Sequence, residues 1–327
     1  GKGAEMTIKK ILAAVTALAM GAAMCGCAGN APAAGKDKPL IITTIFPAYD
    51  FARQVFGDEA EVRMLLRPGQ ESHSYDPSAK DIVEITGCDL FVYNGGESDQ
   101  WVESVLQAAP DIETFRMTDA VSLLDEEVSE GMQADDHDHD DHDHDHDEEE
   151  EEYDEHVWTS PDNASAIVRA LGKRAVELFP QISESLSANA DGYAAQIDAL
   201  DAEFRELLSG EARYFIFGDR FPLLYFFRHY GLNYYAAFPG CGSETEPSAQ
   251  TVTFLLDKLG QPEAVKAVFC IELSGRKLAD VLAEDSGLNV EEFHTCHNIS
   301  ADDLAAGETY LSLMQRNKQM LERVLVN

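Results

Sequence analysis

The sequence predicts an α/β fold of two lobes, each with a small, mainly parallel sheet flanked by helices, bridged by a long rigid helix. Three observations carry this prediction. Short apolar, β-branched runs alternate with helical stretches over residues 40–108, and the same alternation returns over residues 214–326. Between them, residues 182–208 are rich in helix formers and contain few helix breakers. Strands that alternate with helices at this spacing indicate parallel sheets with helices on their faces.

The first lobe is predicted to begin with the apolar run LIITTI at residues 40–45, which Pro47 ends. Further strands are expected at residues 60–66 and 88–93, because each is an apolar run followed by turn residues. Pro68-Gly69 closes the second strand, and Asn94-Gly95-Gly96 closes the third. The intervening helices are expected at residues 49–56, 78–86 and 101–108.

The second lobe repeats this pattern after a helical region. Apolar residues at helical spacing predict a helix over residues 163–178, and Pro180 separates it from the long helix at residues 182–208. So long a helix favours a connector between lobes. Later strands are expected at residues 214–217, 234–238, 264–271 and 290–293, and helices at 222–230, 251–259, 276–285 and 309–326. The predicted domains are therefore residues 39–160, a helical region at 161–209, and residues 210–327.

The first residues resemble a targeting segment. Lys9 and Lys10 precede an apolar stretch at residues 11–24 that is too short for a typical membrane span. Gly26-Cys27 then resembles a bacterial lipobox, which predicts a signal peptide at residues 1–27, a lipid anchor on Cys27 and a flexible tether at 28–38. An ordinary cleaved signal peptide is the alternative. Either interpretation places the folded protein outside the cytoplasmic membrane, and the lipobox interpretation also attaches it to that membrane.

Charge is concentrated in one acidic loop, residues 133–155. The formal net charge is −36, and 19 of the 60 acidic residues lie between residues 125 and 155. Nucleic acid is excluded as a partner because no basic patch is visible, and small cations are favoured. Imidazole is a common ligand for zinc-like metals, so the loop is predicted to bind divalent ions weakly; a merely solvated acidic loop is the alternative. Its five histidines are His137, His139, His142, His144 and His146.

Four cysteines follow the lipobox. They are Cys88, Cys241, Cys270 and Cys296, and they allow three complete pairings that the sequence does not separate. Export permits disulfides. Because the four contain no CxxC pair, one disulfide is favoured over a thiolate metal site.

The remaining histidines predict a second, tighter metal site. His73 and His156 lie in loops rich in Pro, Asp and Ser, and His294 and His297 lie three residues apart. In α/β sheets such loops gather at one edge, so these side chains could close a tetrahedral site in the cleft between the lobes. His229 follows Phe226, Phe227 and Arg228 on a predicted amphipathic helix, where packing or surface exposure is expected.

Several motifs resemble one known family. They are IFPAYDFARQVFGD, PGQESHSYDPSAKDI, LFVYNGGESDQWV, the His-rich acidic loop, EHVWTSPDNA and TYLSLMQRN. Together they are similar to the zinc/manganese substrate-binding lipoproteins of ABC importers, over essentially everything after the tether. This resemblance implies two half-domains joined by a rigid helix, with one metal held between them by four ligands.

The resemblance also implies which residues hold the metal. His73 occupies the first ligand position, in PG-x-x-x-H, and His156 the second, in H-x-W-x-x-P. The third is usually His or Glu before an aromatic helix; here FGDRFPLLYFF offers Asp219, with Glu244 and Glu246 as alternatives. The fourth position, thirteen residues before Tyr310, is His297, with His294 as the alternative. Tyr75 and Asn94 are expected to support these ligands.

The predicted function is capture of Zn²⁺ and its delivery to the cognate permease of an ABC importer. A nitrogen-rich ligand set favours zinc, whereas more carboxylates would favour manganese, so a Mn²⁺-binding homologue remains an alternative. A zinc buffer, chaperone or adhesin without a transporter is another. An enzyme is not expected: the sequence contains neither HExxH nor GxSxG, and a metal site closed by four protein ligands leaves no catalytic water.

Overall fold

The first lobe is built on a four-stranded parallel sheet. The structure is a computed structural model, described for residues 38–133, 153–210, 213–240 and 246–325. The sheet order is β2-β1-β3-β4, so the strand order reverses beside β1. Its strands are β1 (Leu40–Thr43), β2 (Glu61–Met64), β3 (Leu90–Tyr93) and β4 (Thr114–Arg116), with helices α2 (Phe46–Phe56), α3 (Ala79–Thr86) and α4 (Gln100–Ala108).

The second lobe has a sheet of the same topology, in the order β6-β5-β7-β8, and all its pairs are parallel. Its strands are β5 (Tyr214–Phe221), β6 (Asn233–Pro239), β7 (Val268–Ile271) and β8 (Val290–Phe293). Its helices are α7 (Leu224–Tyr230), α8 (Ala249–Leu259), α9 (Lys277–Ser286), α10 (Ala301–Ala306) and α11 (Tyr310–Leu325). Reversal of strand order in such sheets opens a crevice at the carboxyl ends of the strands, where ligands bind.

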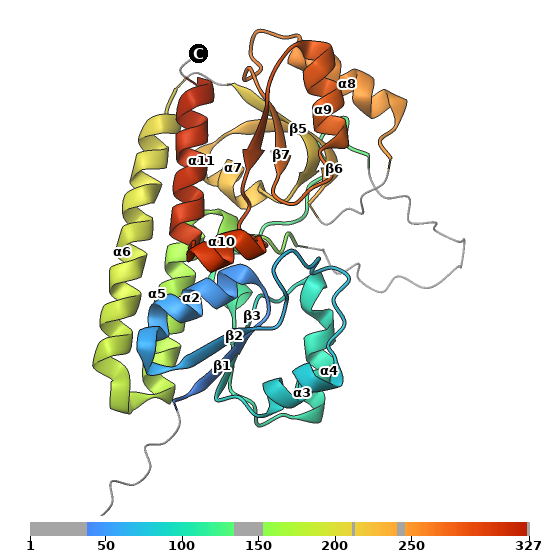
Figure 1. Cartoon of the computed structure of the whole chain (residues 1–327). Helices are drawn as coiled ribbons and strands as arrows, with labels where there is room; N and C mark the ends of the chain where they lie inside the picture. Colours follow the sequence, from blue (N-terminus) through green and yellow to red (C-terminus); the bar gives the residue numbers. More distant parts are fainter. Residues whose placement is uncertain (1–37, 134–152, 211–212, 241–245, 326–327) are drawn as a thin grey trace, which may run out of the picture. The chain divides into compact units, whose positions relative to one another are not determined.

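A long helix joins the lobes. α5 (Pro161–Leu178) begins at a proline, whose fixed φ suits the first turn of a helix. α6 (Ser183–Leu208) follows, and its 26 residues run beside both sheets (Figure 1). It contacts α5 and α2, and it also contacts α7 and α11 of the second lobe. The helix predicted at residues 182–208 is therefore present almost to the residue.

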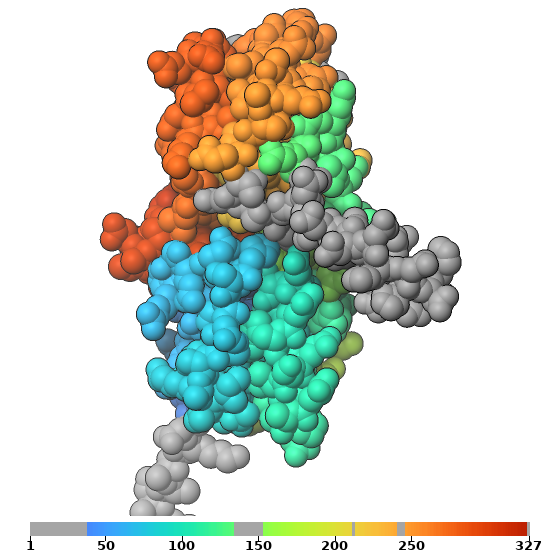
Figure 2. Space-filling model, turned by 90° about the vertical axis from the view of Figure 1, so that its right-hand side faces the viewer, coloured from blue at the N-terminus to red at the C-terminus, as the bar shows by residue number. Residues whose placement is uncertain are grey.

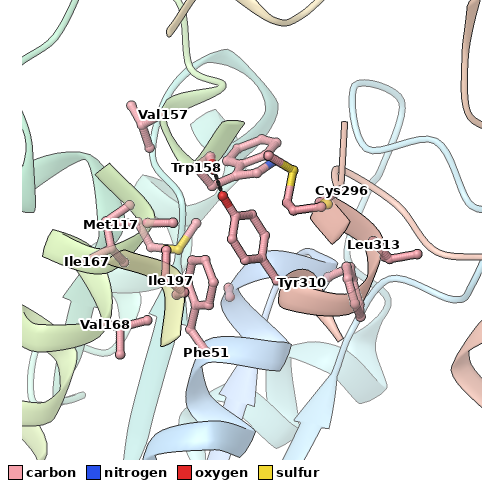
Figure 3. Packing of buried hydrophobic residues seen from close by; sticks show 14 of the residues in the cluster. Phe51, Met117, Val157, Trp158, Ile167, Val168, Ile197, Cys296, Tyr310 and Leu313 are labelled. Carbon is pink, nitrogen blue, oxygen red and sulfur yellow. Dashed lines mark hydrogen bonds between the residues drawn. The ribbon is translucent and has the colours of Figure 1, made fainter. Parts of the chain in front are cut away.

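One hydrophobic core crosses from lobe to lobe. Phe51 of α2, Trp158 and Tyr310 of α11 are fully buried in it (Figure 3). The rings of Phe51 and Tyr310 meet edge to face at 5.2 Å, and the Tyr310 hydroxyl donates to the Trp158 carbonyl at 2.9 Å. Because a close-packed interior resists deformation, this shared core opposes wide separation of the lobes.

A segment of the first half of the chain also lies on the second lobe. Residues 121–133, green in Figure 2, lie against the orange surface of the second lobe. The backbone N–H of Leu124 donates to the Tyr225 hydroxyl at 3.0 Å, and the Gln133 N–H donates to the Ala237 carbonyl at 2.9 Å. This segment belongs by contact to the second lobe, although the predicted first domain includes it.

The structure differs from the sequence prediction most clearly at four elements. β4 and α10 are additional, and β5 continues beyond residue 217 to Phe221 through a register shift. β7 begins at Val268, later than the predicted residue 264. Among the described residues, no helix combines the length and the hydropathy that a membrane span requires.

Candidate metal centre

Three histidines meet at the carboxyl ends of the strands. His73 lies in the loop between β2 and α3, His156 precedes the short helix at Val157–Thr159, and His297 follows β8. One ring nitrogen from each lies within 4.8 Å of the others. Zinc bonded to three imidazoles would draw such nitrogens somewhat closer, since Zn–N bonds are about 2.0–2.1 Å long.

His156 is the most deeply held of the three. Its side chain is buried, and Nδ1 lies 3.1 Å from Oδ1 of Asp154, which also accepts the His156 backbone N–H at 2.8 Å. This pairing assigns the ring proton to Nδ1. Nε2 then carries a lone pair, and it is buried with no hydrogen-bond partner. A carboxylate behind a histidine in this way is typical of metal ligands.

His73 has a comparable support. Its Nδ1 lies 3.0 Å from the Ser98 hydroxyl, which donates to Oε1 of the buried Glu155. Since the hydroxyl proton is engaged with Glu155, Ser98 accepts the Nδ1 proton of His73, which leaves Nε2 available. Glu155 is itself fixed, because its Oε2 accepts the Ser98 backbone N–H at 2.9 Å. The side-chain amide of Asn94 donates to the Glu155 backbone carbonyl at 2.9 Å.

His297 joins the second lobe to the His73 loop. Its Nε2 lies 2.8 Å from the Ser72 hydroxyl, and its backbone N–H donates to Oγ1 of Thr295 at 3.1 Å. Trp158 donates its indole N–H to the Thr295 carbonyl at 3.0 Å. Trp158, two residues after His156, thus anchors Thr295, two residues before His297.

The electrostatics favour neutral rings at two of the positions. Burial lowers the pKa of His73, and burial together with repulsion by the neighbouring histidines lowers that of His297 strongly. Burial acts in the same direction on His156, but the Asp154 carboxylate outweighs it and raises the His156 pKa. Only neutral imidazole ligates a metal, so His73 and His297 are in the binding form at neutral pH.

Asp219, predicted as the third ligand, lies outside this group of three. Because β5 continues through it, its Oδ2 accepts the Ile271 N–H of β7 at 3.1 Å and its Oδ1 accepts the Arg220 N–H at 2.8 Å. The loop expected at this position is therefore a strand, and its carboxylate serves the sheet.

The alternative ligands are also placed elsewhere or lie outside the described residues. His294 accepts the Cys296 N–H at Nδ1, and Glu246 is 91% exposed beside Lys277. Tyr75 donates to Asp81. His229 pairs with Asp201 at 2.6 Å and is not one of the three grouped histidines. Outside the described residues lie Glu244, Cys241, Cys27 and the loop histidines at 137, 139, 142, 144 and 146.

The described cysteines are free thiols. They are Cys88, Cys270 and Cys296, and the last two are buried. The favoured disulfide is therefore not formed among these three. Burial raises the pKa of each thiol, which disfavours the thiolate that a metal site requires.

Sequence reasoning did not identify the groups behind the histidines. Asp154 and Glu155 directly precede His156, so the triplet Asp-Glu-His was a usable signal. Ser72 and Ser98 gave none, because their roles depend on contacts across 225 and 25 residues of sequence. Arg220, beside the rejected Asp219, was also overlooked; its charge disfavours protonation of all three histidines.

The chain is similar to several characterised proteins. At 30% identity over 319 residues, it matches the zinc-binding lipoprotein AdcA of Streptococcus pneumoniae, covering 97% of this chain and 60% of that protein. It is 29% identical to the high-affinity zinc uptake system protein ZnuA of Bacillus subtilis, over 91% of each. It thus spans 60% of the length of AdcA and 91% of that of ZnuA.

Solved structures agree. Zn(II)-bound AdcA from Streptococcus pneumoniae superposes with a TM-score of 0.71 at 27% identity, over 88% of this chain and 57% of that one. The metal-dependent lipoprotein YcdH of Bacillus subtilis gives 0.72 at 26% identity, over 88% and 99%. The model of the family described as zinc-uptake complex component A, periplasmic, matches residues 41–324. The chain belongs to this family of zinc-uptake proteins.

Proposed function

We propose that this protein captures Zn²⁺ outside the cytoplasmic membrane and delivers it to the permease of an ABC importer. The observation that carries the proposal is the meeting of His73, His156 and His297, two of them with a proton-accepting partner on Nδ1. Three nitrogen donors suit zinc better than manganese. The relatives support this metal, since one is a zinc-binding lipoprotein and another a zinc uptake protein.

The predicted lipid anchor, the tether and the histidine-rich loop fit the same function. A lipid on Cys27 would keep the protein at the membrane that holds the permease, and residues 28–38 would give it reach. The histidines at 137–146 would bind additional zinc weakly and raise its concentration near the cleft. These assignments concern residues outside the described part of the chain and rest on the sequence.

Release of the metal is proposed to involve the His73 loop. His156 and His297 are tied through Trp158 to the shared core, so their separation is fixed by packing. His73 lies on a long loop joined to the second lobe by polar contacts, such as Gly69 N–H to the Ile299 carbonyl at 3.0 Å. Such contacts exchange with water at little net cost, whereas separation of the lobes would expose the core.

Calorimetric titration of the metal-free protein with Zn²⁺ and Mn²⁺ tests the site. One tight zinc site is expected, and it should survive deletion of residues 135–152, which should remove only weak binding. His156→Ala should weaken the tight site by more than the 10- to 100-fold typical of losing a ligand's supporting partner. His229→Ala is the matched control, because that ring bonds Asp201 away from the site. Tighter manganese binding, or a tight site that disappears with the loop, would contradict the proposal.

Uptake separates an importer component from a zinc buffer. Cells that lack the protein should take up less ⁶⁵Zn under zinc limitation, and the wild-type gene should restore uptake where the His73→Ala, His156→Ala variant does not. Normal uptake without the protein would favour a buffer or adhesin instead.

A further inference from the structure

The turn that presents His297 is held in an unusual shape by α11. Cys296 has a φ of +61°, in the left-handed region that residues other than glycine rarely occupy. Such a conformation persists only where the surrounding structure holds it. Asn317 of α11 is buried, accepts the His294 N–H at 2.8 Å and donates to the His294 carbonyl at 2.7 Å. The position of His297 therefore depends on the position of α11.

The first turn of α11 is capped from outside its own lobe. The first N–H groups of a helix have no acceptor inside that helix and need one elsewhere. The Tyr310 N–H donates to Oδ2 of Asp50 on α2 at 3.0 Å, and the Leu311 N–H donates to the Tyr193 hydroxyl on α6 at 3.3 Å. α11 contacts both of these helices (Figure 1). The first lobe and the linking helix therefore determine where α11 begins.

Asp50 is the centre of this junction. It is fully buried, and the same Oδ2 that accepts the Tyr310 N–H also accepts the Tyr193 hydroxyl at 2.7 Å. Its Oδ1 accepts from the Gln54 amide at 3.2 Å. A carboxylate at this place faces the positive end of the dipole of a 16-residue helix. An apolar residue would fill the space without the cost of burying an acid, so what the carboxylate adds is a directed attachment of α11 to the first lobe.

We propose that Asp50 is a positioning residue for the metal centre, which fixes His297 relative to the histidines of the first lobe by acting through α11. Two contacts carry the effect from α11 to the site. Asn317 holds the turn before His297, and the Tyr310 hydroxyl donates to the Trp158 carbonyl at 2.9 Å (Figure 3). This inference rests on the proposed function, because it requires the three histidines to bind zinc.

The first test measures the Kd of the folded, full-length protein for Zn²⁺ by competition with a chelator. Asp50→Asn keeps the shape and removes the charge, and it should raise this Kd roughly fivefold or more, the lower end of the usual coupling between separate sites. Asp50→Ala, which also removes the acceptor atoms, should raise it further. Leu282→Ala is the matched control, because Leu282 is fully buried in a core cluster whose described members include none from α11. It should lower stability and leave the Kd unchanged.

The visible spectrum of the Co²⁺-saturated protein separates positioning from stability, since its bands report ligand geometry. The bands of Asp50→Asn should shift, and those of Leu282→Ala should match the wild type. If Asp50→Asn does not fold, Tyr193→Phe replaces it, because that change removes only the hydroxyl that joins Asp50 to the Leu311 N–H.

Combined variants test the route through α11. Asn317→Ala releases the turn from α11, so adding Asp50→Asn to it should raise the Kd by less than the product of the two separate effects. Ser98→Ala weakens the support of His73 within the first lobe, and its effect should multiply with that of Asp50→Asn.

Three results would overturn the proposal while the wild type still binds zinc tightly. They are an unchanged Kd in folded Asp50→Asn, an equal rise of the Kd in Leu282→Ala, and effects of Asp50→Asn and Asn317→Ala that simply multiply. Failure of the wild type to bind Zn²⁺ tightly would instead refute the proposed function, and this inference with it.

Discussion

Replacement of Asp154 by Asn tests how the site prepares His156 for a metal. Oδ1 of Asp154 faces both the backbone N–H and Nδ1 of His156, at 2.8 and 3.1 Å. The two contacts fix the ring orientation and direct the Nε2 lone pair toward the other histidines. Asn keeps the shape and one acceptor oxygen but removes the charge, so the variant isolates the electrostatic part of this support.

Two opposing effects determine the magnitude. Loss of a ligating histidine's partner typically costs 10- to 100-fold in metal affinity, which is about 1.4–2.7 kcal/mol. In the other direction, Asp154 raises the pKa of His156, so the wild type loses zinc affinity as the pH falls through that raised pKa. In Asp154→Asn this pKa is lower, and proton competition begins at lower pH. The full loss is therefore expected near pH 8 and a smaller loss near pH 5.5.

The assay is competition for Zn²⁺ against a chromogenic chelator at a series of pH values, reported as the ratio of the variant's Kd to that of the wild type. Asp119→Asn is the control, because the Asp119 side chain is 71% exposed and lies on another element. An unchanged Kd near pH 8 would refute the role assigned to Asp154. A ratio that grows as the pH falls would refute the argument on proton competition.

Three predictions concern stability, measured by urea unfolding. Burial raises the pKa of Asp99 to about 7, so the folded protein keeps a proton there that the unfolded chain releases near pH 4. The free energy of unfolding therefore decreases as the pH rises from about 4 to about 7. Asp99→Asn resembles the protonated form, so its free energy of unfolding should equal that of the wild type near pH 4 and exceed it by roughly 2–4 kcal/mol near pH 8. Equal stability of the two proteins near pH 8 would contradict this expectation. Tyr310→Phe should cost about 1–3 kcal/mol by leaving the buried Trp158 carbonyl unpaired, and a loss under about 0.5 would show that another donor replaces it. Gly218→Ala would place Cβ 2.7 Å from Cα of Ala279, so a cost of about 1–3 kcal/mol is expected, and a neutral result would mean that α9 shifts freely.

The sequence predicted elements well wherever one local pattern decides them. The long helix is an example, because residues 183–208 combine helix formers without a proline, and the strands at residues 40 and 90 are uninterrupted apolar runs. β4 was missed because Thr114–Arg116 is short and only half buried, so it lacks an apolar signature. β5 was ended too early because Gly218, Asp219 and Arg220 interrupt its apolar run, although its pairing with β6 resumes at Arg220 and Phe221.

The same distinction applies to the site. His73, His156 and His297 each lie in a loop that follows a sheet edge or opens a helix, and the sheet topology brings such loops together, so their proximity follows from local signals. Asp219 was chosen from the resemblance, as the carboxylate nearest to the third ligand position, and no local signal showed that β5 continues through it and engages its carboxylate. Asp154 lies only two residues from His156, whereas the contacts of Ser72 and Ser98 with the rings join distant segments. The placement of residues 121–133 on the second lobe has the same origin, because no local pattern shows which sheet a connecting segment will touch.

Rigidity at two histidines and adaptability at the third bear on which metal the site selects. Affinity alone does not separate zinc from copper or nickel, which compete well for nitrogen donors, so selectivity has to come from geometry. The core fixes His156 and His297 through Trp158 and Thr295, and donors held in this way cannot rearrange toward the square-planar geometry that copper(II) prefers. His73, supported by Ser98 and Glu155 on its own lobe, closes the site and is the ligand whose departure disturbs the core least. On the proposed function, selection and release would be tasks of different histidines, and this division would allow a tight zinc site to empty without unfolding the protein around it.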